Sequence, residues 1–465
     1  MRKTVLLVAL MSLLALGGQS FAELCTVDAV PAATLLLPYF EVSLDDTSDV
    51  NTLFSVNNAS AAPTVAHVTL WGDWSLPSID FDIFLTGYDV QTVNLSSVFN
   101  NGFLPITAHS TNDQGVFSGG AVDAISPHGN NPAWDSSPDN IANPLFPGCD
   151  TNLPLDGGTG DPVLNADLLE RIQSGHTGVA SASFGGGCIG AAYGDNIARG
   201  YITVDNVTDC NVLFPNQAGY FGTGLVSNVN QLWGDYFIIN GTDGFAYGDT
   251  LVHIEADASL DGTGTGANAS GYTFYGRYTA PLGNDNREPL GTAWGTRYLA
   301  TEVPFDGGTD LVVWRDSKYT STDESFTCGS GAPWFPLAET QVVAFDEQED
   351  AAELCLPAPG GISGISPPPA PGVDPTCFPL ETARYRVGEG ELAGVFDFGW
   401  LFLNLNHTLG ITGFTDPFPG LAQSYVATNL DSFSANLSVG FSAIQLATAC
   451  DTAAAGGSPV ISGTL

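Results

Sequence analysis

Basic residues are scarce in this chain of 465 residues, which has 11 lysines and arginines against 50 aspartates and glutamates and a formal net charge of −39. Such a chain repels phosphate backbones and anionic lipids, which argues against nucleic acid and charged membrane surfaces as partners. Divalent cations and other cationic partners are favoured instead. Hydrophobic residues still make up 44% of the chain, so it can build a core despite its charge.

Familiar catalytic motifs are missing as well. The sequence has no GxSxG, SxxK, HExxH or GxxxxGK[ST], and no GxGxxG placed between a strand and a helix. These absences argue against the common serine hydrolases, zinc proteases and nucleotide enzymes. The six histidines are scattered without metal-ligand spacing, so we expect structural roles for them.

No run after residue 22 is long and apolar enough to span a bilayer, so no membrane span is expected. The apolar run 4–16 is short, follows Arg2 and Lys3, and precedes the small-residue stretch 20–22. This pattern predicts a signal peptide over residues 1–22, cleaved before Glu23. We therefore expect a secreted protein, located outside the cell, on its surface or in the periplasm.

Cysteines occur only after the predicted cleavage site. Export places them in an oxidising compartment, where eight cysteines predict four disulfides. Their spacing leaves the connectivity open, although Cys188 with Cys210, or Cys355 with Cys377, would close short loops. The eight are Cys25, Cys149, Cys188, Cys210, Cys328, Cys355, Cys377 and Cys450.

Alternating side chains predict an all-β fold with minor α content, in an antiparallel β-sandwich architecture. The clearest half-buried strands are 64–71 and 78–85, and 395–405 is apolar on both faces, as in a central strand. Further strand-like runs are 250–259, 271–279, 311–314, 341–345, 383–387 and 436–446. The chain forms either two β domains or one large sandwich with long loop insertions.

Composition divides the chain after the signal peptide into six parts. A helix is expected near 161–174, since Asp161 caps it, Pro162 opens it, and Leu164, Leu168, Leu169 and Ile172 form its buried side. The parts are an N-terminal β region (23–111), a Gly/Pro/Asn-rich loop (112–160), a central β region (161–356), a Pro-rich linker or loop (357–380), a C-terminal β region (381–450) and a flexible tail (451–465).

The pattern Leu-Trp-Gly-Asp-aromatic occurs twice, at residues 70–74 and 232–236. One interpretation is a strand that ends in a Gly-Asp turn covered by aromatics. The other is a duplicated domain whose aromatic rims bind a glycan or small ligand. In that case the ligand-binding residues are Trp71, Trp74, Trp233 and Tyr236.

Turns rich in Asp and Asn predict structural calcium, because hard cations prefer oxygen ligands. None matches the EF-hand loop, and such turns also form without metal. The candidate ligands are Asp45, Asp46, Asp49, Asp261, Asp285, Glu288, Asp306 and Asp310. No other cofactor is expected.

Two further sets of charged residues are worth locating. A glycosidase would need two carboxylates in one cleft, and the candidates in strand-like segments are Glu255, Asp257, Glu288, Glu302, Asp316 and Glu339. The rarer arginines should each find a carboxylate in so acidic a chain. Those considered are Arg199, Arg287, Arg297 and Arg315.

The runs 194–201, 232–237, 248–255, 286–289 and 310–316 resemble those of uncharacterised bacterial secreted proteins, over most of the mature chain. The resemblance implies one architecture shared among exported proteins, and it assigns no catalytic or binding residue.

Three classes of function remain. The preferred one is a secreted, non-catalytic surface or matrix protein of structural or adhesive type, which would associate with itself or with the cell surface. The alternatives are an extracellular glycan- or small-ligand-binding β module, with an exposed aromatic strip, and an extracellular glycoside hydrolase, with two converging carboxylates in a cleft. The missing motifs favour a protein that is not an enzyme.

Overall fold

The computed structural model describes residues 25–105, 107–108, 124–125, 164, 166–209, 213–217, 219–222, 224–260, 272–279, 285–300, 306–316, 325–329, 339–355, 376–407, 421–432 and 437–450. These residues fold mainly into antiparallel strands, which confirms the all-β prediction. Within them no helix has the length and apolar character needed to cross a membrane. The predicted signal peptide and tail lie outside the described residues.

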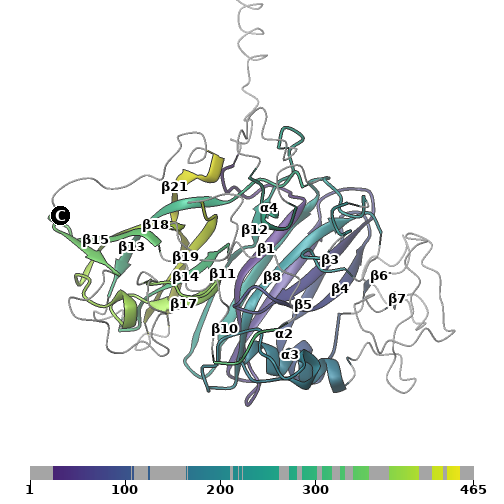
Figure 1. Cartoon of the computed structure of the whole chain (residues 1–465), viewed down its shortest axis with the longest axis horizontal. Helices are drawn as coiled ribbons and strands as arrows, with labels where there is room; N and C mark the ends of the chain where they lie inside the picture. The colour runs from purple at the N-terminus through teal and green to yellow at the C-terminus, as the bar shows by residue number, and fades with distance from the viewer. Residues whose placement is uncertain are drawn as a thin grey trace, which may run out of the picture.

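Two sheets form one half of the molecule (Figure 1). The first has the order β12-β1-β8-β3-β4, and the second has the order β11-β10-β2-β5, with β9 beside β2. Their strands are β1 (Thr34–Ser43), β2 (Val50–Asn58), β3 (Thr64–Trp71), β4 (Pro77–Leu85), β5 (Val90–Asn94), β8 (Ile197–Val207), β9 (Leu232–Trp233), β10 (Asp235–Asn240), β11 (Phe245–Thr250) and β12 (Val252–Ile254). Strands from both sides of the 112–160 segment therefore pair in the same sheets.

The apolar face of the first sheet carries Val68, Leu70 and Phe81, which share one hydrophobic core with Phe54 and Ile238 of the second sheet. The strands β3 and β4 match the predicted ranges 64–71 and 78–85. However, both faces of these strands are buried, not one. The reason is that the polar face is covered too, as described below.

The third sheet fills the other half of the molecule (Figure 1). Its order is β16-β15-β18-β13-β19-β14-β17, with β20 beside β19 and β21 beside β13. Strand β13 pairs with β19 only at Gly291 and Ser424, so the sheet divides there into two wings. One wing contains β16, β15, β18, β13 and β21, and the other contains β20, β19, β14 and β17. Its strands are β13 (Gly291–Leu299), β14 (Gly308–Arg315), β15 (Glu339–Phe345), β16 (Ala351–Leu354), β17 (Thr382–Arg386), β18 (Phe398–His407), β19 (Ser424–Ser432), β20 (Leu437–Ser442) and β21 (Ile444–Thr448).

Helices are few and short. The predicted helix near 161–174 is α3 (Ala166–His176), which buries Leu168 and Ile172 but leaves Leu169 only partly buried. It packs beside α2 (Leu95–Asn101) near one end of the first sheet (Figure 1). The remaining elements are α4 (Gly276–Thr279), the short strands β6 (Thr107–Ala108) and β7 (Ala124–Ile125), and the 3₁₀ turns Ala182–Phe184 and Gly390–Leu392.

Three predicted strands need correction. The run 271–279 contains α4 instead of a strand, because backbone hydrogen bonds from Tyr278 and Thr279 to Tyr275 turn the chain. In the run 250–259, Thr250 ends β11 and only Val252–Ile254 form β12, and 436–446 is divided between β20 and β21. The prediction for 395–405 is confirmed, since β18 lies between β15 and β13.

Candidate functional site: buried charge clusters

The polar face of the first sheet carries a row of side chains from four neighbouring strands. Thr34, Asp205, His67 and Asp82 lie opposite one another on β1, β8, β3 and β4. His67 Nδ1 is 2.7 Å from Asp82 Oδ1, and His67 Nε2 is 3.6 Å from Asp80 Oδ2. All of these side chains are buried. The row therefore places an imidazole among carboxylates away from solvent.

The charge of His67 follows from these neighbours. Burial alone would lower the pKa of His67, but the carboxylates of Asp82, Asp80 and Asp205, with the hydrogen bond to Asp82, raise it to about 9. At neutral pH His67 is therefore a buried cation. It acts as the counter-ion of the acidic side chains around it.

A second cation, Arg287, lies beside the same row. Its Nε is 3.5 Å from Asp205 Oδ1 and donates a hydrogen bond to Thr34 Oγ1. The hydroxyls of Tyr220 and Tyr275 donate to Asp205 Oδ2 at 2.7 and 2.9 Å. These tyrosines cover part of the polar face, where Tyr220 also packs against the His67 ring, and they help to bury both faces of β3 and β8.

Arg277 of α4 connects the first sheet to the third. Its Nη1 lies 3.0 Å from Asp316 Oδ1 and 3.0 Å from Glu381 Oε1, and its Nη2 donates to the Tyr201 hydroxyl at 3.2 Å. Tyr201 belongs to β8, where its ring stacks on Trp71. Arg277 thus holds the carboxylates of Asp316 and Glu381, which directly follow β14 and directly precede β17, against the first sheet.

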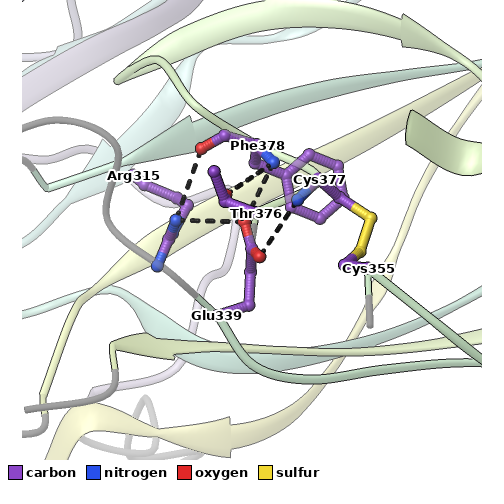
Figure 2. Close-up of a disulfide and its surroundings, with 6 residues drawn as sticks. All are labelled: Arg315, Glu339, Cys355, Thr376, Cys377 and Phe378. Carbon is purple, nitrogen blue, oxygen red and sulfur yellow. Dashed lines mark hydrogen bonds and ion pairs between the residues drawn. A yellow bond between two sulfur atoms is a disulfide. The ribbon is translucent and has the colours of Figure 1, made fainter. Parts of the chain in front are cut away.

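Arg315 and Glu339 form another buried pair, shown in Figure 2, with an N–O distance of 3.4 Å. The Glu339 carboxylate accepts hydrogen bonds from Thr376 Oγ1 and from the backbone N–H groups of Cys377 and Phe378, at 3.1 and 2.9 Å for the last two. Arg315 also donates to the carbonyl oxygen of Leu405. The pair fixes the chain where the Cys355–Cys377 disulfide joins it.

A further cluster surrounds Asp310 on β14. Arg384 and Arg386 of β17 both donate to its carboxylate. Arg384 also lies 3.1 Å from Glu41 of β1, which in turn is 3.5 Å from Arg199. This chain of ions joins the third sheet to the first.

The arginine prediction is confirmed for three residues. Arg199 pairs with Asp195 and Glu41, Arg287 with Asp205 and Asp285, and Arg315 with Glu339. Arg297 is the exception, because it forms no ion pair with the described residues. Its guanidinium lies over the ring of Trp400, 5.3 Å from the centroid.

The four predicted ligand-binding aromatics do not form an exposed strip. Trp71, Trp74 and Tyr236 are buried, while Trp233 is 40% exposed. The two copies of the motif also have different surroundings, since Trp71 ends β3 at a turn whereas Trp233 and Tyr236 lie on consecutive short strands. Only Trp233 is placed for contact with a ligand from solvent.

The candidate calcium ligands are dispersed. Asp45 accepts a hydrogen bond from Asn196, Asp46 from Ser48, and Asp285 from backbone N–H groups. Glu288 accepts one from the N–H of Cys25, and Asp310 binds two arginines. The backbone N–H of Asp49 donates to the carbonyl oxygen of Asp46, Asp306 lies in the turn before β14, and Asp261 is outside the described residues. The part of the chain that the structure describes contains no group of three or more ligands that could hold a metal ion.

Three of the candidate hydrolase carboxylates, Glu255, Asp257 and Glu288, lie near one another, and the backbone N–H of Glu288 donates to the carbonyl oxygen of Glu255. Asp316 and Glu339 bind different arginines, and Glu302 lies outside the described residues. Glu288 also has a strongly raised pKa. Burial, together with the nearby charges of Glu255 and Asp257, raises its pKa to about 7 despite the N–H of Cys25.

A serine and a histidine also meet. Ser78 Oγ is 2.7 Å from His176 Nε2, and His176 Nδ1 is 2.8 Å from the carbonyl oxygen of Arg199. Burial lowers the pKa of His176 to about 4, so the ring is neutral. Both side chains are buried, and the His176 ring packs against Phe40 and Phe99. Without exposure the pair serves as a satisfied polar contact in the core.

Three disulfides lie among the described residues, Cys25–Cys450, Cys188–Cys328 and Cys355–Cys377. Of the two short loops considered, only that of Cys355 and Cys377 forms. Cys188 bonds with Cys328 because the backbone of its strand-like segment pairs with that of Phe326. Cys149 and Cys210 lie outside the described residues.

No family model, curated protein or solved structure matches the chain.

The spacing of residues in the sequence did not identify the side chains that bring the sheets together. The alternation did place His67, Asp80 and Asp82 on polar faces of two adjacent predicted strands. That pattern was the available signal for the first cluster.

Proposed function

We propose that the protein is an exported, non-catalytic protein of structural or adhesive type, acting at the cell surface or in an extracellular matrix. The observation that supports this is the position of the charged groups. Arg277, Arg287 and Arg315 are buried together with their carboxylates. Pairs buried in this way fix the arrangement of strands and sheets, which supports a structural role.

The disulfides support the same proposal. Cys25–Cys450 joins the ends of the described chain over a sequence separation of 425 residues. Such bonds persist in oxidising compartments and restrict the unfolded chain. A protein stabilised in this way suits a long life outside the cell.

Two assays on the purified, disulfide-bonded mature chain test the proposal. In the first, the protein is incubated with a panel of polysaccharides, and the release of reducing ends is measured. We expect no release above that of heat-denatured protein. Release that disappears in a folded Glu255→Gln or Glu288→Gln variant, whose carboxylates lie near each other, would support the hydrolase instead.

The second assay measures retention on cells and binding to insoluble polysaccharide. After expression with its own leader in a bacterial host, we expect the protein in the cell-surface or matrix fraction, accessible to added protease. The exposed Trp233 favours glycan binding as the second candidate function. Polysaccharide binding that is lost in Trp233→Ala but not in Trp400→Ala would support that candidate.

A further inference from the structure

One wing of the third sheet has an apolar outer face that is open to solvent. Phe398 and Trp400 of β18 are 46% and 38% exposed, and Ile444 and Leu446 of β21 are 54% and 52% exposed. Between them lies Gly295 of β13, where an added methyl group would be 3.1 Å from Leu446 Cδ1 and 3.5 Å from Trp400 Cζ3. The side chains from both flanking strands therefore meet over the glycine and form one surface.

Cross-strand partners on neighbouring strands continue this surface across the sheet. Arg297, Trp400 and Phe345 lie opposite one another on β13, β18 and β15. The neighbouring row contains Ile444, Gly295 and Phe402. We call these residues, together with Phe398 and Leu446, the outer face of the third sheet.

The sequence of β18 does not fit a strand with one solvated face. In antiparallel sheets a solvated face usually shows polar residues that alternate with buried apolar ones. In β18 the inward Leu401, Leu403 and Leu405 are buried, yet the outward positions are Phe398, Trp400 and Phe402. Exposed apolar patches of this kind mark interaction sites.

The composition of the outer face resembles the centre of a protein interface. Aromatic residues and arginine are enriched in interface cores, and tryptophan and arginine supply many binding hot spots. Arg297 is exposed, lies over Trp400, and has no ion pair among the described residues of a chain with 50 acidic side chains. Its charge is available for a carboxylate of a partner.

Acidic side chains next to this face indicate which kind of partner it would bind. Exposed Glu353 of β16 pairs with Val343 of β15, which in turn pairs with Phe402 of β18, so Glu353 continues the row of Gly295 and Phe402. Exposed Asp397 directly precedes Phe398. A surface with an apolar centre, one cation and an acidic edge can pair with an identical surface on a second copy of the chain. In a two-fold arrangement each copy can place its arginine against the acidic edge of the other.

We propose that the outer face of the third sheet binds a second copy of this chain, forming a two-fold symmetric dimer. This inference rests on the proposed structural or adhesive function and names its partner. The net charge of −39 on each chain opposes association until salt screens it. Dimerisation should therefore strengthen as the screening length falls from about 30 Å in ~0.01 M salt to about 8 Å in ~0.15 M salt.

Sedimentation velocity of the mature, disulfide-bonded protein tests this over a wide range of concentrations and at both salt levels. We expect a concentration-dependent dimer. The Trp400→Ser substitution should weaken it about 30-fold, as removal of a central anchor does, and Arg297→Glu should weaken it about tenfold. The matched control is Trp233→Ser, which removes an equally exposed tryptophan from another sheet and should leave the dimer intact.

Near-ultraviolet circular dichroism of each variant shows whether it folds, and Arg297→Glu provides a second variant that alters only an exposed side chain. A wild-type chain that stays monomeric at every concentration and salt level would overturn the dimer. Equal weakening by Trp233→Ser and Trp400→Ser would overturn the assignment of the face. Either result leaves the proposed non-catalytic function in place, since the polysaccharide and surface assays test it separately.

Discussion

His67 has no exposed surface, yet it carries a charge at neutral pH. Moving an ion from water into a protein costs several kcal/mol unless partners compensate for the lost hydration. The carboxylates of Asp80, Asp82 and Asp205 provide that compensation, and His67 in turn makes their burial tolerable. The residue is therefore a structural ion instead of a catalytic base.

Replacing His67 with Gln should lower the free energy of unfolding by about 3–5 kcal/mol near neutral pH, because the buried carboxylates lose a cation. The pKa of His67 is raised in the folded state, from 6.5 to about 9. Its contribution, about 3 kcal/mol for this shift, is fully present below pH 6.5 and is lost as the pH rises through about 9. Urea titrations at several pH values should show the difference between wild type and variant decreasing over that range.

His253→Gln is the control for this experiment. Burial lowers the pKa of His253 from 6.5 to about 4, so as the pH rises above 7 His253 is largely neutral in both folded and unfolded chains. Its effect on stability should stay constant between pH 7 and pH 9. A difference for His67→Gln that is equally constant would contradict the buried-cation interpretation.

At the scale of the strand, the repeated Leu-Trp-Gly-Asp pattern has a local explanation. A methyl group at Gly72 would lie 2.4 Å from the carbonyl oxygen of Ile189, and one at Gly234 would lie 2.2 Å from that of Ser55. Each glycine therefore allows another segment of backbone to approach the strand closely. The two copies share this requirement, although one is a turn and the other lies between two short strands.

Substituting either glycine with alanine should destabilise the protein by about 1–3 kcal/mol, since the backbone must move to admit the methyl group. Gly222→Ala is the matched control, because no atom lies within 4 Å of its added methyl group. Thermal unfolding measures all three variants. Unchanged melting temperatures for Gly72→Ala and Gly234→Ala would show that these contacts are not tight.

The alternation of apolar and polar residues predicted some strands correctly and others incorrectly. The strands β3, β4 and β15 follow from alternation, because one face of each carries most of its core residues, whereas β14 buries apolar side chains on both faces. The run 271–279 failed because its aromatic residues, such as Tyr275, are buried by tertiary contacts in a turn and do not alternate. The strand β1 contains Pro38 at a register shift, which interrupts its pattern.

The charge clusters depend on contacts that sequence spacing does not encode. The prediction that arginines pair with acids was correct for Arg199, Arg287 and Arg315. The particular partners were not predictable, since Arg277 meets Glu381 across 104 positions. Likewise, the burial of Trp71 follows from stacking on Tyr201 and Tyr278, which lie in distant segments.

At the scale of the whole molecule, ionic clusters join the first sheet to the third. Arg277 connects β8 to the third sheet, and Arg384 connects β17 to β1. Such buried pairs cost desolvation, so they contribute less to stability than to the specific relative placement of the sheets, which we infer to be their role here. The excess negative charge remains, and it destabilises the compact state through self-repulsion.

Salt should therefore stabilise the protein by screening, and this sets the expected response to calcium. Two of the candidate calcium ligands already have partners within the protein, since Asp46 accepts a hydrogen bond from Ser48 and Asp310 of β14 binds Arg384 and Arg386. We expect calcium, magnesium and sodium chlorides at matched ionic strength to raise the melting temperature equally, compared with chelator in low salt. A shift specific to calcium that grows with the logarithm of its free concentration would instead demonstrate a binding site.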